Sequence, residues 1–164
     1  AIPFIFRTSN TERMRIDSAG HVTMPYQPAF HAHKGTAQVN ITLNASTTIT
    51  FDNENFDNNG DFASSTFTAP VTGKYQLNVS VRVDEVDDVT QYTIIQLVTS
   101  NRAIQLIHGN SGYDADVNYM SISGSHIVDM DASDTAFVEI NLPSLGTAQL
   151  DVNGETRFSG FLVC

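Results

Sequence analysis

The nine residues from Tyr75 to Val83 constrain the fold of this chain more than any other stretch. Apolar and polar side chains alternate strictly along them, with the apolar set being Tyr75, Leu77, Val79, Val81 and Val83. Successive residues of a strand point to opposite faces, so this pattern predicts a long strand with one buried face. Pro70 and Gly73 precede it and predict a strand end followed by a tight turn.

The rest of the chain predicts an all-β domain. Its 164 residues suffice for one domain with a sizeable core, and no apolar stripe of helical period occurs. Eight to ten short strands at regular spacing are typical of a sandwich or jelly roll. The other expected strands are 29–34, 39–43, 48–51, 92–98, 103–107, 119–130 and 136–142, with an acidic loop at 52–61 and a hairpin at 150–157.

Composition excludes several classes of function. The chain has 18 acidic and 8 basic residues, a net charge of −10, which argues against nucleic acid or an anionic membrane as partner. No apolar run reaches the roughly 20 residues that cross a bilayer. Cys164 is the single cysteine, so no internal disulfide forms. No nucleophile, phosphate-loop or zinc-protease motif occurs, and we expect no enzyme.

Residues 1–28 differ from the rest. Alternation at 13–17 and 22–24, around a turn at 18–21, predicts a small hairpin with too little apolar surface to stand alone. The segment from Glu12 to Val22 resembles an element that precedes the C-terminal heads of bacteriophage tail fibres. We expect a shaft-connecting β arm at 1–28 and a head at 29–164; an ordinary hairpin arm is the alternative.

The head resembles the globular domains of complement C1q and tumour necrosis factor. The resemblance rests on Phe51-Asp52, the Asn59-Gly60 turn, the segment Phe67–Tyr75 and the closing segment Phe158–Leu162, in that order. It implies an antiparallel jelly-roll sandwich that forms a homotrimer, binds a partner on its outer surface and carries no catalytic site.

The closing strand is apolar on both faces. Phe158 and Leu162 fall on one face, and Phe161 and Val163 fall on the other. A sandwich strand that faces water should alternate with polar residues, so the second face needs a partner. We expect Phe158, Phe161 and Val163 at a trimer interface, with Gly160 leaving room for a neighbouring subunit; cover by a loop is the alternative.

Two histidines form a candidate metal site. His31 and His33 are two residues apart on an expected strand, so both imidazoles project from one face. Around a threefold axis they would offer six nitrogens to a transition metal, with Phe30 and Ala32 facing the core. The alternative is two partly exposed histidines near a strand start.

Two acidic clusters could bind Ca²⁺, which takes six to eight oxygen ligands. The alternative for both is solvated loop charge. The clusters are Asp84, Asp87 and Asp88, and Asp114, Asp116 and Asn118.

The function that we expect is attachment of a phage tail fibre to its host, on the virion and outside the cell. Saccharide sites favour an aromatic face beside carboxylates and amides, and one polar loop offers that mixture. The expected ligand-binding residues are Tyr113, Asp114, Asp116 and Asn118. The partners would be a cell-surface glycan or protein receptor and the upstream fibre shaft. A structural trimerisation knob and a secreted C1q-like recognition protein are the alternatives.

Overall fold

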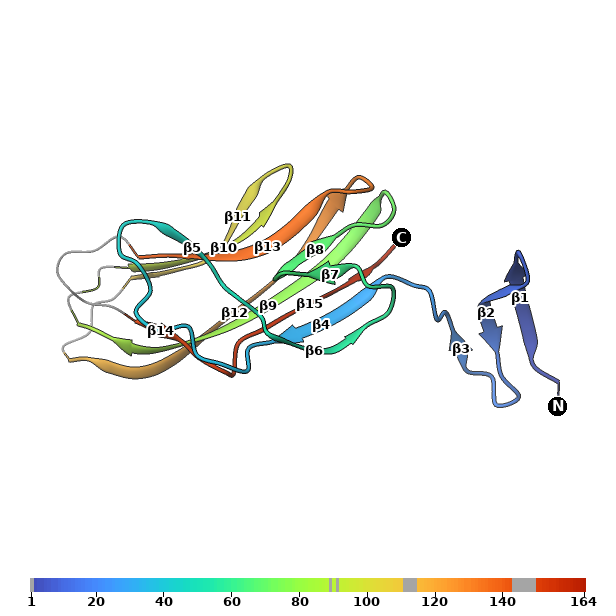
Figure 1. Cartoon of the computed structure of the whole chain (residues 1–164), viewed down its shortest axis with the longest axis horizontal. Helices are drawn as coiled ribbons and strands as arrows, with labels where there is room; N and C mark the ends of the chain where they lie inside the picture. Colours follow the sequence, from blue (N-terminus) through green and yellow to red (C-terminus); the bar gives the residue numbers. More distant parts are fainter. Residues whose placement is uncertain (1, 89, 91, 111–114, 143–149) are drawn as a thin grey trace.

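The computed structural model describes residues 2–88, 90, 92–110, 115–142 and 150–164. Every regular element among them is a β-strand, and all pairings between named strands are antiparallel. Figure 1 shows two layers of strands packed face to face, with a small separate sheet at the N-terminal end. The expected all-β antiparallel fold is confirmed.

The first layer is built around the strand that the alternating run predicts. It has the order β12-β9-β15-β4-β6, with β14 also pairing with β9. The alternate residues Tyr75, Leu77, Val79, Val81 and Val83 are all buried. The strands are β4 (Ala29–His33), β6 (Asn53–Asp57), β9 (Gly73–Val86), β12 (Val117–Met130), β14 (Asp151–Val152) and β15 (Arg157–Leu162).

The second layer has the order β11-β10-β13-β8-β7, with β5 also pairing with β13. The expected strands at 92–98 and 103–107 correspond to β10 and β11, which form a hairpin and pair from Tyr92 with Asn110 to Val98 with Ala103. The strands are β5 (Ser46–Thr48), β7 (Phe62–Ala63), β8 (Thr66–Thr68), β10 (Tyr92–Thr99), β11 (Ala103–Asn110) and β13 (Thr135–Asn141).

An aromatic cluster joins the two layers. The ring of Phe30 stacks on Phe62 at 4.9 Å and on Phe67 at 4.8 Å, and meets Phe158 edge-on at 5.0 Å between centroids. Each such pair contributes about 0.5–1.5 kcal/mol beyond the area that it buries. Strands β4 and β15 are thereby fixed against β7 and β8, and their alternate residues face outward.

The N-terminal residues form a three-stranded sheet of β1 (Phe4–Thr8), β2 (Thr11–Ile16) and β3 (Val22–Thr23). The expected hairpin corresponds to β2 and β3, where Ile16 pairs with Val22. Strand β1 was not expected. The sheet connects to the head through residues 24–28, which run beside the end of β15: Leu162 N donates to Pro28 O at 3.0 Å.

Residues 39–43 form no strand, although their alternation predicts one. Asn40 and Asn44 have φ values of +55° and +58°, which break an extended backbone at both ends of the pattern. Ile41 is buried all the same, and its N donates to Leu150 O at 3.0 Å. The alternation here reflects burial along an irregular segment.

Residues 53–57 form β6, where the sequence predicted an acidic loop. The strand pairs with β4, as shown by His31 opposite Phe56. The turn that follows is held by the Asp57 carboxylate, which accepts hydrogen bonds from the backbone N of Gly60, Asp61 and Phe62 at 2.9–3.1 Å. Gly60 has a φ of +74°, as expected for the turn.

The hairpin predicted at 150–157 does not form. Strands β14 and β15 both pair with β9 instead of with each other. On β9, Asp84 and Val83 pair with β14, and the residues from Ser80 to Tyr75 pair with β15. The turn residues 153–156 lie between these two pairings and leave the β-ladder with β9. The prediction was wrong because turn residues between two apolar runs also occur where one strand leaves and rejoins the same neighbour.

Candidate functional site

The outer face of the β9 sheet carries small polar side chains at its centre. The register aligns the outward residues of four strands into rows across the sheet. One row is Ser123, Ser80, Arg157 and His33, and the next is Ser125, Asn78, Ser159 and His31. A second protein surface can approach the sheet closely over the serines and Asn78 of these rows, because their side chains are short.

Hydrogen bonds between neighbouring strands fix the positions of these side chains on the sheet. Ser123 Oγ donates to Ser80 Oγ at 3.0 Å, and Ser125 Oγ donates to Asn78 Oδ1 at 2.9 Å. Gln76 Nε2 also donates to Asn78 Oδ1, at 3.2 Å, and to Ser125. The centre of the face is therefore an ordered surface.

An open hollow of about 560 Å³ lies over this centre. His31 and Arg157 border it on the side of β4 and β15, and Gly124 contributes to its floor on β12. The hollow offers hydroxyl, amide and imidazole groups together. It could receive either a polar ligand or a side chain from another protein.

Exposed apolar side chains surround the polar centre. Phe161 on β15 and Val163 beyond it are each 46% exposed, and Ile127 on β12 is 56% exposed. Phe56 on β6 is 50% exposed and Tyr119 on β12 is 65% exposed. A rim of large apolar groups around small polar ones is unusual for a sheet that faces only water.

The closing strand has two apolar faces, as its sequence predicts. One face is buried in the core of the protomer, and the other is exposed. Phe158 is fully buried in the protomer's own core, so its expected place at a trimer interface is wrong. Gly160 also faces inward: a Cβ there would lie 2.5 Å from Leu77 Cδ2 and 2.9 Å from Phe30 Cε1. Gly160 makes room for this core, and no neighbour is needed to explain it.

Phe161 and Val163 face outward, where a subunit could contact them. Their role at a trimer interface stays a prediction.

His31 and His33 project from β4 onto the outer face, with Phe30 and Ala32 buried behind them as expected. Burial lowers the pKa of His31 below its ordinary 6.5, and the charges of Arg157 and His33 lower it further. His33 Nδ1 is buried without a hydrogen-bond partner. Such an atom suits a contact from another subunit or a metal, so the metal site stays a prediction.

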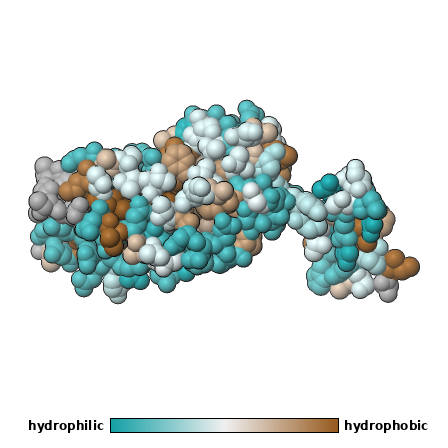
Figure 2. Space-filling view, in the orientation of Figure 1, coloured by the Kyte–Doolittle hydropathy of each residue, from teal (hydrophilic) through white to brown (hydrophobic). Residues whose placement is uncertain are grey.

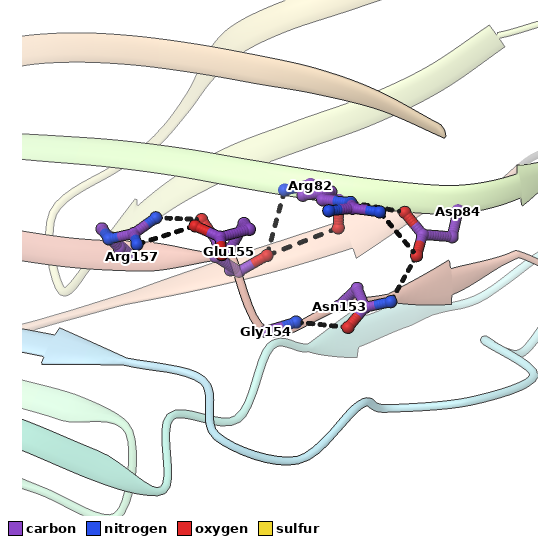
Figure 3. A network of polar contacts seen from close by, with 7 residues as sticks. Arg82, Asp84, Asn153, Gly154, Glu155 and Arg157 are labelled. Atoms are coloured by element: carbon purple, nitrogen blue, oxygen red, sulfur yellow. Dashed lines mark hydrogen bonds and ion pairs between the residues drawn. The ribbon is translucent and has the colours of Figure 1, made fainter. Parts of the chain in front are cut away.

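A polar network anchors the segment that joins β14 to β15 (Figure 3). Arg82 Nε lies 2.8 Å from Asp84 Oδ1, and the Asn153 amide donates to the other oxygen of Asp84. The Arg82 guanidinium also lies over the ring of Tyr119, 4.9 Å from its centroid. Arg157 pairs with Glu155 at 2.8 Å. The network fixes Tyr119 and Arg157 at the border of the outer face.

The acidic residues group differently from the two expected Ca²⁺ clusters. Asp84 is paired with Arg82, whereas Asp87, Asp88 and Asp116 place their carboxylates within 4.8 Å of one another. Within the described part of the chain, it is the one group of three or more such side chains that lie close enough to share a metal ion. Three carboxylates would supply only part of a Ca²⁺ coordination shell.

The four expected ligand-binding residues are described only in part. Asp116 and Asn118 are exposed, and Asp116 Oδ1 accepts a hydrogen bond from Asp88 N at 3.1 Å. Tyr113 and Asp114 lie outside the described residues. The structure thus brings Asp116 to the Asp87–Asp88 connection, a contact between two loops that sequence reasoning treated separately.

Sequence reasoning missed the outer face as a site. The alternation at 75–83 predicts the buried face, but it assigns no role to the polar side chains between, which include Gln76, Asn78 and Ser80. The signal was the small size of Asn78 and Ser80, which recurs at Ser121, Ser123 and Ser125 on β12. The register that places the two sets side by side cannot be derived from either strand alone.

Comparisons with solved structures bear out the jelly-roll arrangement. The globular domain of zebrafish complement 1qA matches with a TM-score of 0.58 and 17% identity, over 84% of this chain and 98% of that one. Murine APRIL at pH 8.0 matches with a TM-score of 0.55 and 15% identity, over 84% and 99%. A search of curated protein sequences finds none that matches.

A family model covers most of the chain. The model of the C1q domain matches residues 29–163, which include both layers of the head and exclude the N-terminal sheet. No helix in the described ranges is long and apolar enough to cross a membrane. The sequence match and the jelly-roll sandwich agree, and the chain belongs to the C1q domain family.

Proposed function

We propose that this chain is the homotrimeric head of a phage-type tail fibre, and that it attaches the particle to a glycan on the host surface. The observation that carries the proposal is the layout of the head. The N-terminal sheet joins at one end of the two layers, and the Asp87–Asp88 connection lies at the other (Figure 1). This layout suits a tip that projects from a shaft.

C1q domains typically mediate recognition, form homotrimers outside the cell and are generally non-enzymatic. Those properties are shared by a fibre tip, a structural knob and a secreted recognition protein. The finer assignment rests on residues 1–28, whose sequence resembles a fibre element and which we assign to the shaft-connecting arm.

The homotrimer would bury the outer face of the β9 sheet. Small central side chains allow close approach, and the exposed Phe161, Val163 and Ile127 gain by leaving water. His33 Nδ1 would gain a partner in the same contact. We expect His31 and His33 of three subunits to lie together, where a transition metal could bind.

Glycan recognition would take place at the end far from the arm. Asp116 and Asn118 lie there, and we propose that Tyr113 and Asp114 complete the site with an aromatic face and a further carboxylate. Three copies on one head would multiply a weak affinity wherever receptors are dense.

The test is competition for adsorption. The purified chain should block binding of fibre-bearing particles to host cells, and Tyr113→Ala and Asp116→Asn should block less well while remaining trimeric. Asp131→Asn is the matched control, because Asp131 is also exposed but lies in the turn between β12 and β13, near the arm. Equal blocking by all four proteins would place the receptor site elsewhere.

Two other outcomes distinguish the alternatives. A trimeric chain that does not compete, with or without substitutions, would favour a structural knob. A secreted recognition protein should have a collagen-like region upstream, with Gly at every third position. The full-length gene decides between that protein and a fibre.

A further inference from the structure

The N-terminal sheet has one apolar face and one polar face. The register pairs Phe4 with Ile16 and Phe6 with Met14, and it pairs Ile16 with Val22 on the third strand. Directly paired residues lie on the same side of a sheet, so these five share one face. We call this the arm's apolar face, made of Phe4, Phe6, Met14, Ile16 and Val22.

The opposite face carries Ile5 among charged side chains, several of which already have contacts. Ile5 pairs with Arg15, and a bulge after Phe6 brings Arg7 opposite Glu12 on this side. Arg15 forms an ion pair with Glu12 at 2.7 Å. Beside it, the Arg13 guanidinium lies over the ring of Tyr26, 4.7 Å from its centroid.

The contact between Arg13 and Tyr26 joins the arm to its linker. Tyr26 O accepts a hydrogen bond from Asn59 Nδ2 on the head at 3.2 Å, so Tyr26 connects Arg13 of the arm to the head.

The apolar face is left uncovered in a single chain. Phe4 is 61% exposed, Phe6 is 48% exposed and Val22 is 53% exposed. The two phenylalanine rings contact each other edge to face, with 4.9 Å between centroids. Figure 2 shows hydrophobic atoms at the surface of this small sheet. Three short strands with an uncovered apolar face are marginal on their own.

We propose that the apolar faces of three arms pack against one another in the assembled protein, forming a three-sided bundle below the heads. The occupant of each face is a second copy of the same sheet. This inference rests on the proposed homotrimer of the head. The inference goes beyond the head trimer because it gives the arm a role of its own in assembly.

The area of the face supports this choice of occupant. Phe4, Phe6 and Val22 leave about 300 Å² of apolar surface on each arm, or about 900 Å² on three, if a phenylalanine exposes about 200 Å² when free. Stable interfaces bury about 1,200 Å² or more, so free arms would not associate firmly. Arms tethered to one trimeric head are at high effective concentration and need much less area.

The charges of the arm and the head also favour a second arm as the partner of each apolar face. The arm has three arginines against one glutamate and one aspartate, whereas the head has five basic against sixteen acidic residues. Three arms can therefore approach without the repulsion that opposes close contact between acidic surfaces. Linker residues 24–28 end beside Leu162, next to the exposed Phe161 and Val163, so each arm joins its head at the edge of the proposed head interface.

The experiment is disulfide formation between arms in the full chain. With Cys164 changed to serine, Phe4→Cys and Phe6→Cys are compared with Arg7→Cys, which neighbours Phe6 on β1 but lies on the polar face. After mild oxidation we expect covalent dimers from Phe4→Cys and Phe6→Cys, about tenfold more than from Arg7→Cys. The yield should not change on dilution, because the pairing arms belong to one trimer.

A second variant keeps the inference testable if a cysteine disturbs the strand. Phe6→Ser should expose the arm, so that trypsin cuts after Arg13 or Arg15 faster than in the wild type while the head stays intact.

The outcomes separate this inference from the proposed head trimer. Reduced cysteine variants with the mass of one chain would overturn both. Trimers that form no dimer at Phe4 or Phe6, that crosslink equally at Arg7, or whose yield rises with concentration would overturn the packing of the arms alone.

Discussion

Gly160 illustrates how one residue sets the packing of the head. It lies on β15 and faces the aromatic core. A Cβ would lie 2.5 Å from Leu77 and 2.9 Å from Phe30, closer than real contacts allow. The sequence suggested a close approach at Gly160 but could not tell which side of the strand it served.

We therefore predict that Gly160→Ala lowers the free energy of unfolding by about 1–3 kcal/mol through overpacking. Gly154→Ala is the control, because a Cβ there would meet only Lys34 O, at 3.4 Å. Urea unfolding followed by circular dichroism measures both. A fully stable Gly160→Ala variant would contradict this packing.

His31 gives the stability a pH dependence. Its pKa is lowered by burial first, then by Arg157 and His33. The unfolded chain therefore binds a proton at a higher pH than the folded chain does. The contribution of His31 to stability should be greatest above pH 6.5, should fall as the pH drops below that value, and should stop falling once the pH lies below the folded pKa of His31.

Thermal unfolding between pH 5 and pH 8 in the presence of a chelator tests this prediction. His31→Gln should lose part of the decline seen in the wild type. Superimposable profiles would show that His31 does not contribute to it.

At the scale of elements, the segment 153–156 joins two strands that pair with the same neighbour. Thr156 is fully buried, and its Oγ1 accepts a hydrogen bond from Arg82 N at 3.0 Å, between the pairings of β14 and β15 with β9. The hydroxyl thus replaces a missing backbone partner.

Thr156→Val keeps the shape of the side chain but leaves the N–H of Arg82 without an acceptor. We expect a loss of about 1–3 kcal/mol in the free energy of unfolding. Thr156→Ser retains the hydroxyl and should lose less. Denaturant unfolding compares the two variants, and a more stable valine variant would contradict the role of this hydrogen bond.

The sequence predicted long apolar strands better than short polar ones. Strand β9 follows directly from its alternating side chains, and strands β10 and β11 follow from two apolar runs on either side of a polar turn. Strand β6, with the sequence Asn-Glu-Asn-Phe-Asp, has little strand propensity and forms because β4 offers a free edge. Residues 39–43 show the converse, because left-handed asparagines break a pattern that otherwise predicts a strand. Pairing partners and backbone dihedrals are tertiary properties.

The candidate site was predicted unevenly for the same reason. The two faces of the closing strand could be assigned by alternation, and so could the common face of His31 and His33. Which face is the core required the second layer, and Phe158 was placed wrongly without it. The rows of serine and asparagine on the outer face depend on the register between β9, β12 and β15.

At the scale of the whole molecule, the head combines a filled core with an unfilled outer face. The core needs no second chain, since Phe30, Phe67 and Phe158 are buried within one protomer. The outer face has a polar centre with an open hollow over it and an apolar rim. Assembly would therefore join folded heads, and its loss should leave the individual fold intact.

The most direct test of this account is the mass of the folded protein in solution. Light scattering of the wild type should give about three times the chain mass of 17.9 kDa. Phe161→Asp places a charge on the outer face of β15 and should give a single chain mass with an unchanged β-sheet spectrum, because burying that unpaired charge costs more than the contact gains. A monomeric wild type, or a Phe161→Asp variant that stays trimeric, would contradict assembly through this face.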